Sequence, residues 1–146
     1  MHSTLLLLHF LGATIWTGGH LILALSILPT ALRNSDVDTI RTFESRFERV
    51  GIPDLGIQIV TGVLLVLQYF PQGHGLMQWV NPVARLALIK LGLLALTAGL
   101  AIDARLRLIP RLDPDNLKAL AWHIIPVTFI SALFVYIGLR FRFGGL

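Results

Sequence analysis

The sequence predicts an all-α integral membrane protein, a bundle of four antiparallel transmembrane helices with a short amphipathic helix at the membrane interface. Hydrophobic residues make up 55% of the 146 residues and charged residues only 14%, whereas soluble domains carry about 25% charged residues. The apolar residues gather in four segments of about 20 residues, the length needed to cross about 30 Å of hydrocarbon. Short connections between such segments favour an up-and-down bundle.

The chain is expected to form a single domain, residues 1–146, without a repeat. The four predicted spans cover about residues 4–28, 52–70, 82–104 and 117–139. Several boundaries coincide with prolines, which a helix tolerates best at its start. Between the first two spans, residues 36–50 predict the interfacial helix, because apolar side chains recur there on one face. That face carries Ile40, Phe43, Phe47 and Val50.

Basic residues flank the spans unevenly, and this predicts the orientation. The first and third connections hold most of them: Arg33, Arg41, Arg46, Arg49, Arg105, Arg107 and Arg111, with Lys118 at the edge of the third connection. The second connection, residues 71–81, has no Lys or Arg. The positive-inside rule then places the first and third connections in the cytoplasm and both termini outside. We attribute the net charge of +4 to this topology and not to nucleic-acid binding, and read Arg140 and Arg142 as headgroup anchors.

Three histidines lie inside predicted spans, namely His9 and His20 in the first and His123 in the fourth. An ionisable ring in hydrocarbon is costly and marks a functional site by default. His9 and His20 face the same way to within about 20° and lie about 16 Å apart along the helix. They are therefore too far apart to share one metal ion, and two stacked sites are predicted.

Counting residues from the span ends pairs the polar side chains by depth. His20 and His123 fall in the half near the arginines, and His9 and Lys90 fall in the other half. His74, in the second connection, is a further candidate partner for His9. Asp54 and Asp103 lie near the arginine-rich boundary, where ion pairs are expected.

Two imidazoles on facing helices at one depth can bind a b-type haem from both sides. Gly12 and Gly19 would leave room for the flat ring, and Trp16 would pack between the two levels. In this hypothesis the cofactor-binding residues are His9, His20, His123, Lys90, Trp16, Gly12 and Gly19. The alternative is structural: each histidine would bond a neighbouring helix, and the glycines would allow close helix packing.

The chain has no cysteine and only two methionines. This composition excludes disulfides, iron–sulfur clusters and thioether-linked haem, and it leaves few soft ligands for Cu(I). Copper remains an alternative cargo, because neutral imidazole suits this metal. The metal ligands in that case would be His2, His9, His20, His74 and His123.

Several short motifs resemble the copper-resistance protein D (CopD) family. They are His9 with Trp16-Thr17-Gly18-Gly19-His20, Leu28-Pro29, Phe43-Glu44, Phe47-Glu48-Arg49, Thr61-Gly62, Arg85 with Lys90-Leu91, and Ile109-Pro110-Arg111. This resemblance implies copper handling at the bacterial inner membrane. The layout is also similar to the HemJ-type protoporphyrinogen oxidases, four-span proteins for which the resemblance implies haem b. The chain departs from that type at Thr30-Ala31-Leu32, which is not basic and aromatic.

We therefore expect a haem b-binding redox protein of the inner membrane, with both termini periplasmic. If it is an enzyme, it would be a haem-dependent membrane oxidoreductase. The alternatives are a copper transport or resistance protein and a structural subunit of a membrane complex. Expected partners are the lipid bilayer, a second copy, and a quinone or a periplasmic redox or copper-carrying protein.

Overall fold

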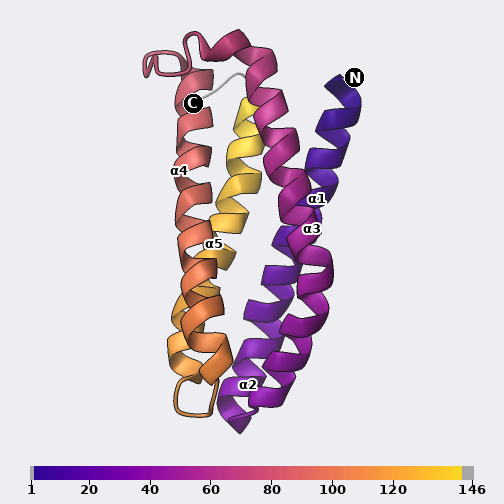
Figure 1. The fold of residues 1–146 in the computed structure, drawn as a ribbon, viewed down its shortest axis with the longest axis vertical. Coiled ribbons are helices and arrows are strands. Elements are labelled where there is room, and N and C mark those ends of the chain that lie inside the picture. Colours follow the sequence, from indigo (N-terminus) through magenta and orange to yellow (C-terminus); the bar gives the residue numbers. More distant parts are fainter. Residues whose placement is uncertain (1, 143–146) are drawn as a thin grey trace.

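The computed structural model describes residues 2–142, and all regular structure in that range is helical. The long helices are α1 (His2–Ile22), α3 (Val37–Tyr69), α4 (Pro82–Asp103) and α5 (Leu117–Arg142). The short elements are η1 (Leu23–Ile27), α2 (Leu28–Asn34), η2 (Pro71–Gly73), η3 (Ala104–Leu108) and η4 (Ile109–Arg111). The four long helices run side by side as an antiparallel bundle (Figure 1).

The prediction of four membrane spans is confirmed. The segments His2–Asn34, Val37–Tyr69, Pro82–Arg111 and Leu117–Phe141 are each long and apolar enough to cross a bilayer. They extend beyond the predicted spans because η1 and α2 continue α1, while η3 and η4 continue α4. Both termini lie at one end of the bundle, here called the terminal end (Figure 1). The opposite end, which carries α2, the start of α3 and the segment 104–116, is the arginine end.

The bundle is an arc of helices. The main packing contacts join α1 to α3 and to α5, and join α4 to α5. The helices α3 and α4 therefore lie at the two ends of the arc (Figure 1). The helices α1 and α5 form the middle of the arc, and side chains from α3 and α4 point towards the space between them.

A separate interfacial helix over residues 36–50 is not confirmed, because this segment is the first half of the continuous helix α3. Asp36 caps the helix by accepting hydrogen bonds from the Thr39 amide at 3.0 Å and the Thr39 hydroxyl at 2.6 Å. These hydrogen bonds lower the pKa of Asp36. Pro53 lies inside the helix without ending it, as membrane helices tolerate.

The apolar face of this first half packs on protein instead of lying on the membrane surface. Ile40 is fully buried in a core cluster at the arginine end. Its neighbours in that cluster include Leu23, Leu28, Ala31, Leu112, Leu117 and Leu120. The cluster closes the bundle at the arginine end, and the cavity described below lies next to it, on the side of the terminal end.

Truncating this core residue tests the packing of α3. Ile40→Ala is expected to destabilise the protein by about 2–5 kcal/mol, since it removes a buried side chain and leaves a cavity. Thermal unfolding of the detergent-purified protein measures the loss. Val50→Ala is the matched control on the same helix, because Val50 is 53% exposed and should change stability little. Equal effects of the two changes would contradict the observed packing of α3.

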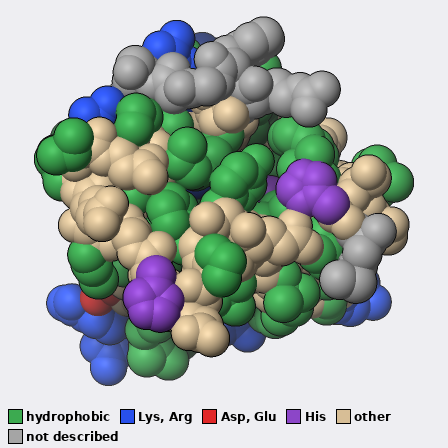
Figure 2. All heavy atoms as spheres, turned by 90° about the horizontal axis from the view of Figure 1, so that it is seen from above, with side chains coloured by type: hydrophobic (Ala, Val, Ile, Leu, Met, Phe, Trp, Pro, Cys, Tyr) green, Lys and Arg blue, Asp and Glu red, His purple; other side chains and the backbone are tan. Residues whose placement is uncertain are grey.

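The terminal end carries fewer Lys and Arg residues than the arginine end. Seen from the terminal end, the Lys and Arg side chains in view lie at the margins of the molecule (Figure 2). The connection between α3 and α4 has no Lys or Arg. The distribution of basic residues along the bundle therefore matches the asymmetry on which the predicted orientation rests.

Candidate functional site

Side chains from all four long helices line a cavity of about 370 Å³ in the half of the bundle near the arginine end. Its walls are largely apolar and aromatic, with a few ionisable groups. The residues that matter below are Trp16, Gly19, His20, Glu44, Phe47, Glu48, Arg105 and His123. His20 and His123, which the sequence placed at one depth, thus share one cavity.

His20 is oriented by its own helix and by two aromatic rings. Its Nδ1 lies 2.9 Å from the carbonyl oxygen of Trp16, one turn earlier, so Nδ1 donates and Nε2 keeps its lone pair. The Trp16 ring lies 4.5 Å from the imidazole, and the Phe47 ring meets it edge-on at 5.6 Å. Nε2 makes no hydrogen bond to any residue that the structure describes. An imidazole fixed through one nitrogen and free at the other is typical of a metal ligand.

His123 is held at both ring nitrogens. Nδ1 lies 3.0 Å from the carbonyl oxygen of Ala119, and Nε2 lies 2.8 Å from a carboxylate oxygen of Asp103. Both partners are hydrogen-bond acceptors, so neither ring nitrogen is left without a partner. Arg107 also pairs with Asp103 at 2.8 Å, which agrees with the ion pair expected for Asp103. His123 therefore faces the cavity already bound, whereas His20 is free to coordinate.

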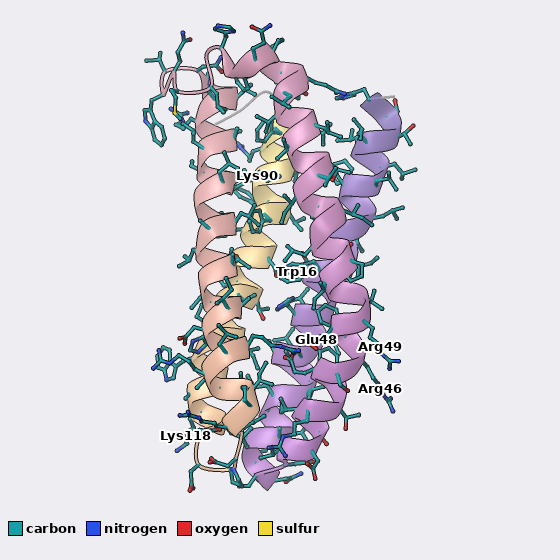
Figure 3. The ribbon with its side chains drawn as sticks, in the orientation of Figure 1. Trp16, Arg46, Glu48, Arg49, Lys90 and Lys118 are labelled. Atoms are coloured by element: carbon teal, nitrogen blue, oxygen red, sulfur yellow. The ribbon has the colours of Figure 1, made fainter. Side chains whose placement is uncertain are left out.

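Two carboxylates of α3 give the cavity a polar edge. Glu48 forms an ion pair with Arg105 and points from α3 towards the interior of the bundle, while Arg46 and Arg49 point away from it (Figure 3). Glu44 lines the cavity one turn earlier. These two carboxylates and Arg105 were not among the predicted site residues. The signal that could have found them is the repeat Phe43-Glu44 and Phe47-Glu48, which places both acids on one face.

The side chain of His9 lies outside this cavity, at the interface between α1 and α3. Its Nδ1 is 2.9 Å from the Thr61 hydroxyl, which donates in turn to the Ile57 carbonyl at 2.7 Å. Gln58 donates to the carbonyl oxygen of His9. His9 is therefore absent from the walls of the cavity that His20 lines, and the sequence expectation of two separate levels matches this placement.

Lys90 projects from α4 into the bundle towards the terminal end (Figure 3). Its Nζ lies 5.7 Å from the centre of the Phe141 ring. The structure does not bring His74 to this pair. His74 is exposed in the connection after α3, with Nδ1 3.3 Å from the Pro71 carbonyl oxygen.

The glycines of α1 serve close packing against α3. A Cβ at Gly12 would meet the side chains of Gln58 and Asp54, and a Cβ at Gly19 would meet the Phe47 ring. Gly12 therefore offers no space for a flat cofactor, although the sequence had assigned it that role. Gly19 contributes to the cavity wall only beside the Phe47 ring that packs on it.

Within residues 2–142, no group of three or more His, Asp or Glu side chains is arranged to hold a metal ion. A bare ion would therefore find two or fewer such ligands together. The free Nε2 of His20 in an apolar cavity suits instead a metal that brings most of its own ligands, as haem iron does.

The fold and the cavity define a multi-pass membrane protein with a histidine-lined intramembrane site. Residues 41–139 match the family of copper resistance protein D, and the chain belongs to that family. The matched segment contains Lys90 and His123 and leaves out His9 and His20. No curated protein and no solved structure matches the chain significantly.

Proposed function

We propose that this member of the copper resistance protein D family is a membrane redox protein that binds haem b in the cavity at the arginine end. The proposal rests on one observation about His20. Its Nδ1 is held by the Trp16 carbonyl oxygen, and its Nε2 makes no hydrogen bond to a described residue. Bound haem would supply one-electron transfer. The role of the chain is to ligate, orient and shield the group.

The walls of the cavity are mainly apolar and aromatic, as the surroundings of an apolar ligand would be. A volume of about 370 Å³ falls within the range of about 300–1,000 Å³ that ligand pockets occupy. Trp16 and Phe47 would pack against the ring and exclude water, and Arg105 at the polar edge would pair with a propionate carboxylate. His123 could bind the iron only by giving up its hydrogen bond to Asp103. His20 is therefore the residue that would bind the haem iron.

The orientation of the protein is part of the same proposal. The arginines at one end place that end in the cytoplasm and both termini in the periplasm of a bacterial inner membrane. The cavity then lies in the cytoplasmic half of the bilayer. Its electron partner would be a small lipid-soluble carrier such as a quinone, or another membrane protein beside the bundle.

Copper handling is the second candidate, and the family match favours it. His20, Glu44 and Glu48 line one cavity, and imidazole with carboxylate can bind Cu(II). Copper would be a transient cargo in this case, because the described residues hold no cluster of three such ligands. The two candidates predict different colours and metal contents for the purified protein.

A visible spectrum of the detergent-purified protein, oxidised and then reduced with dithionite, tests the proposal. Metal analysis of the same sample separates the candidates. A Soret band and visible bands that shift on reduction, together with stoichiometric iron, support haem b. A sample without these bands that retains copper supports the second candidate. A colourless, metal-free sample after expression with ample haem and copper overturns both.

A further inference from the structure

Asp54, near the middle of α3, is a buried carboxyl group without a counter-ion. Asp54 is 5% exposed, and its Oδ2 has no hydrogen-bond partner among the side chains and backbone groups that the structure describes. The ion pairs found in this range use the acids Asp38, Glu48 and Asp103. The sequence expectation of an ion pair at Asp54 is therefore wrong for the part of the chain that the structure describes. A buried, unpaired carboxylate is very costly, and taking up a proton removes the cost.

Asp54 is one end of a line of polar side chains along the α1–α3 interface. Its Oδ1 and the amide of Gln58 converge on Gly12. Gln58 donates to the main chain of His9, and the His9 ring bonds Thr61. Nearer the terminal end, His2 bonds Gln68. The line thus runs from the middle of the bundle to its terminal end.

The Asp54 end of the line approaches the cavity. Asp54 lies about one helical turn from Gly51, and Gly12 about one turn from Trp16; Gly51 and Trp16 both line the cavity. The titratable groups on the line besides Asp54 are His2 and His9, both from α1, while Lys90 projects from α4 into the bundle. No cation is paired with Asp54 among the described residues.

Helix association does not explain an aspartate here. Neutral Ser, Thr, Asn or Gln side chains suffice to bond neighbouring helices in a membrane, and Gln58 and Thr61 already do so. An ionisable residue in a span is costly, and chains of Asp, Glu and His are the usual means of moving protons through membrane proteins.

We propose that the α1–α3 interface is a proton path, in which Asp54 and His9 take up and release the proton while Gln58 and Thr61 hold them in place. Asp54 takes up a proton from the side of the cavity, passes it through intervening water to a ring nitrogen of His9, and His9 releases it towards the terminal end. The path uses none of the cavity ligands, so it does not depend on whether the cavity holds haem or copper.

Proton flux into liposomes tests the path. The purified full-length protein is reconstituted with the pH-sensitive dye pyranine inside, and a potassium gradient with valinomycin imposes a membrane potential. The wild type should acidify or alkalise the lumen faster than protein-free liposomes, and Asp54→Asn should lose this difference. Thr97→Val is the matched control, because Thr97 is a second buried side chain with an unbonded oxygen, on α4, and it should conduct like the wild type.

A second measurement keeps the proposal open to refutation if Asp54→Asn does not fold. His9→Gln, which keeps a hydrogen-bonding side chain but cannot take up the proton, should also lose the flux. Infrared difference spectra between high and low pH should show a carboxylic-acid C=O band that Asp54→Asn removes. Wild-type flux equal to that of protein-free liposomes, or a folded Asp54→Asn variant that conducts like the wild type, would overturn the proton path. Neither result would affect the spectral test of the cavity.

Discussion

Replacing His20 by alanine is expected to remove the haem absorbance bands of the purified protein. The imidazole Nε2 is the free ligand in the cavity, and its loss leaves only apolar contacts and Arg105 to hold the group. Removing an outer-shell partner of a metal typically costs about 10–100-fold in affinity, and removing the ligand itself should cost at least as much. Pyridine haemochrome analysis of detergent-purified protein, normalised to protein content, measures the loss.

Two histidine variants serve as controls for this result. His74→Ala should keep the wild-type haem content, because His74 is exposed in the connection after α3. His123→Ala should also retain haem, because the Nε2 of His123 is bonded to Asp103. Loss of haem in His123→Ala with full retention in His20→Ala would reverse the assignment of the axial ligand.

The second large effect is expected at Gly19. A methyl group there would overlap the ring of Phe47, and this ring also meets His20 edge-on and stacks on Phe43 at 5.5 Å. The Phe47 ring cannot move without disturbing these neighbours, so Gly19→Ala should destabilise the protein by about 1–3 kcal/mol, as overpacking usually does. Thermal unfolding in detergent, followed by circular dichroism, measures the change.

The neighbouring glycine provides the control. A Cβ at Gly18 would have no heavy atom within 4 Å. Gly18→Ala should therefore leave stability unchanged or raise it by up to about 1 kcal/mol, because alanine is the better helix former. If both alanine variants unfold at the same temperature, the Phe47 ring does not require a glycine at position 19.

Two aspartates, Asp103 and Asp54, were both expected near the arginine-rich boundary, and they have different surroundings in the structure. Proximity to arginines predicted ion pairs for Asp103 and Asp54 alike, and only Asp103 forms one in the described structure. Asp54 lies on the face of α3 that packs on α1 at Gly12, and Arg46 and Arg49 point the other way (Figure 3). Depth can be counted from the sequence, but the direction of a side chain around the helix axis depends on which neighbour the helix packs against.

The same distinction applies to the candidate ligands. Residue counting separated His9 from the pair His20 and His123, and the structure has that separation. Counting could not tell that Asp103 holds the Nε2 of His123 while the Nε2 of His20 makes no bond to a described residue. It also could not place Glu44 and Glu48 in the cavity wall, since residues 36–50 were assigned to the membrane surface.

The sequence alone determined the fold class, the four spans and the uneven distribution of arginines, because these depend on the length and composition of contiguous segments. Three features were decided only by the tertiary structure. They are the free Nε2 of His20, the packing of α3 side chains against the glycines of α1, and the lack of a counter-ion for Asp54 among the described residues. These features depend on the rotation and order of the helices in the bundle. Packing between segments distant in the sequence sets that rotation, and the spacing within any one helix does not encode it.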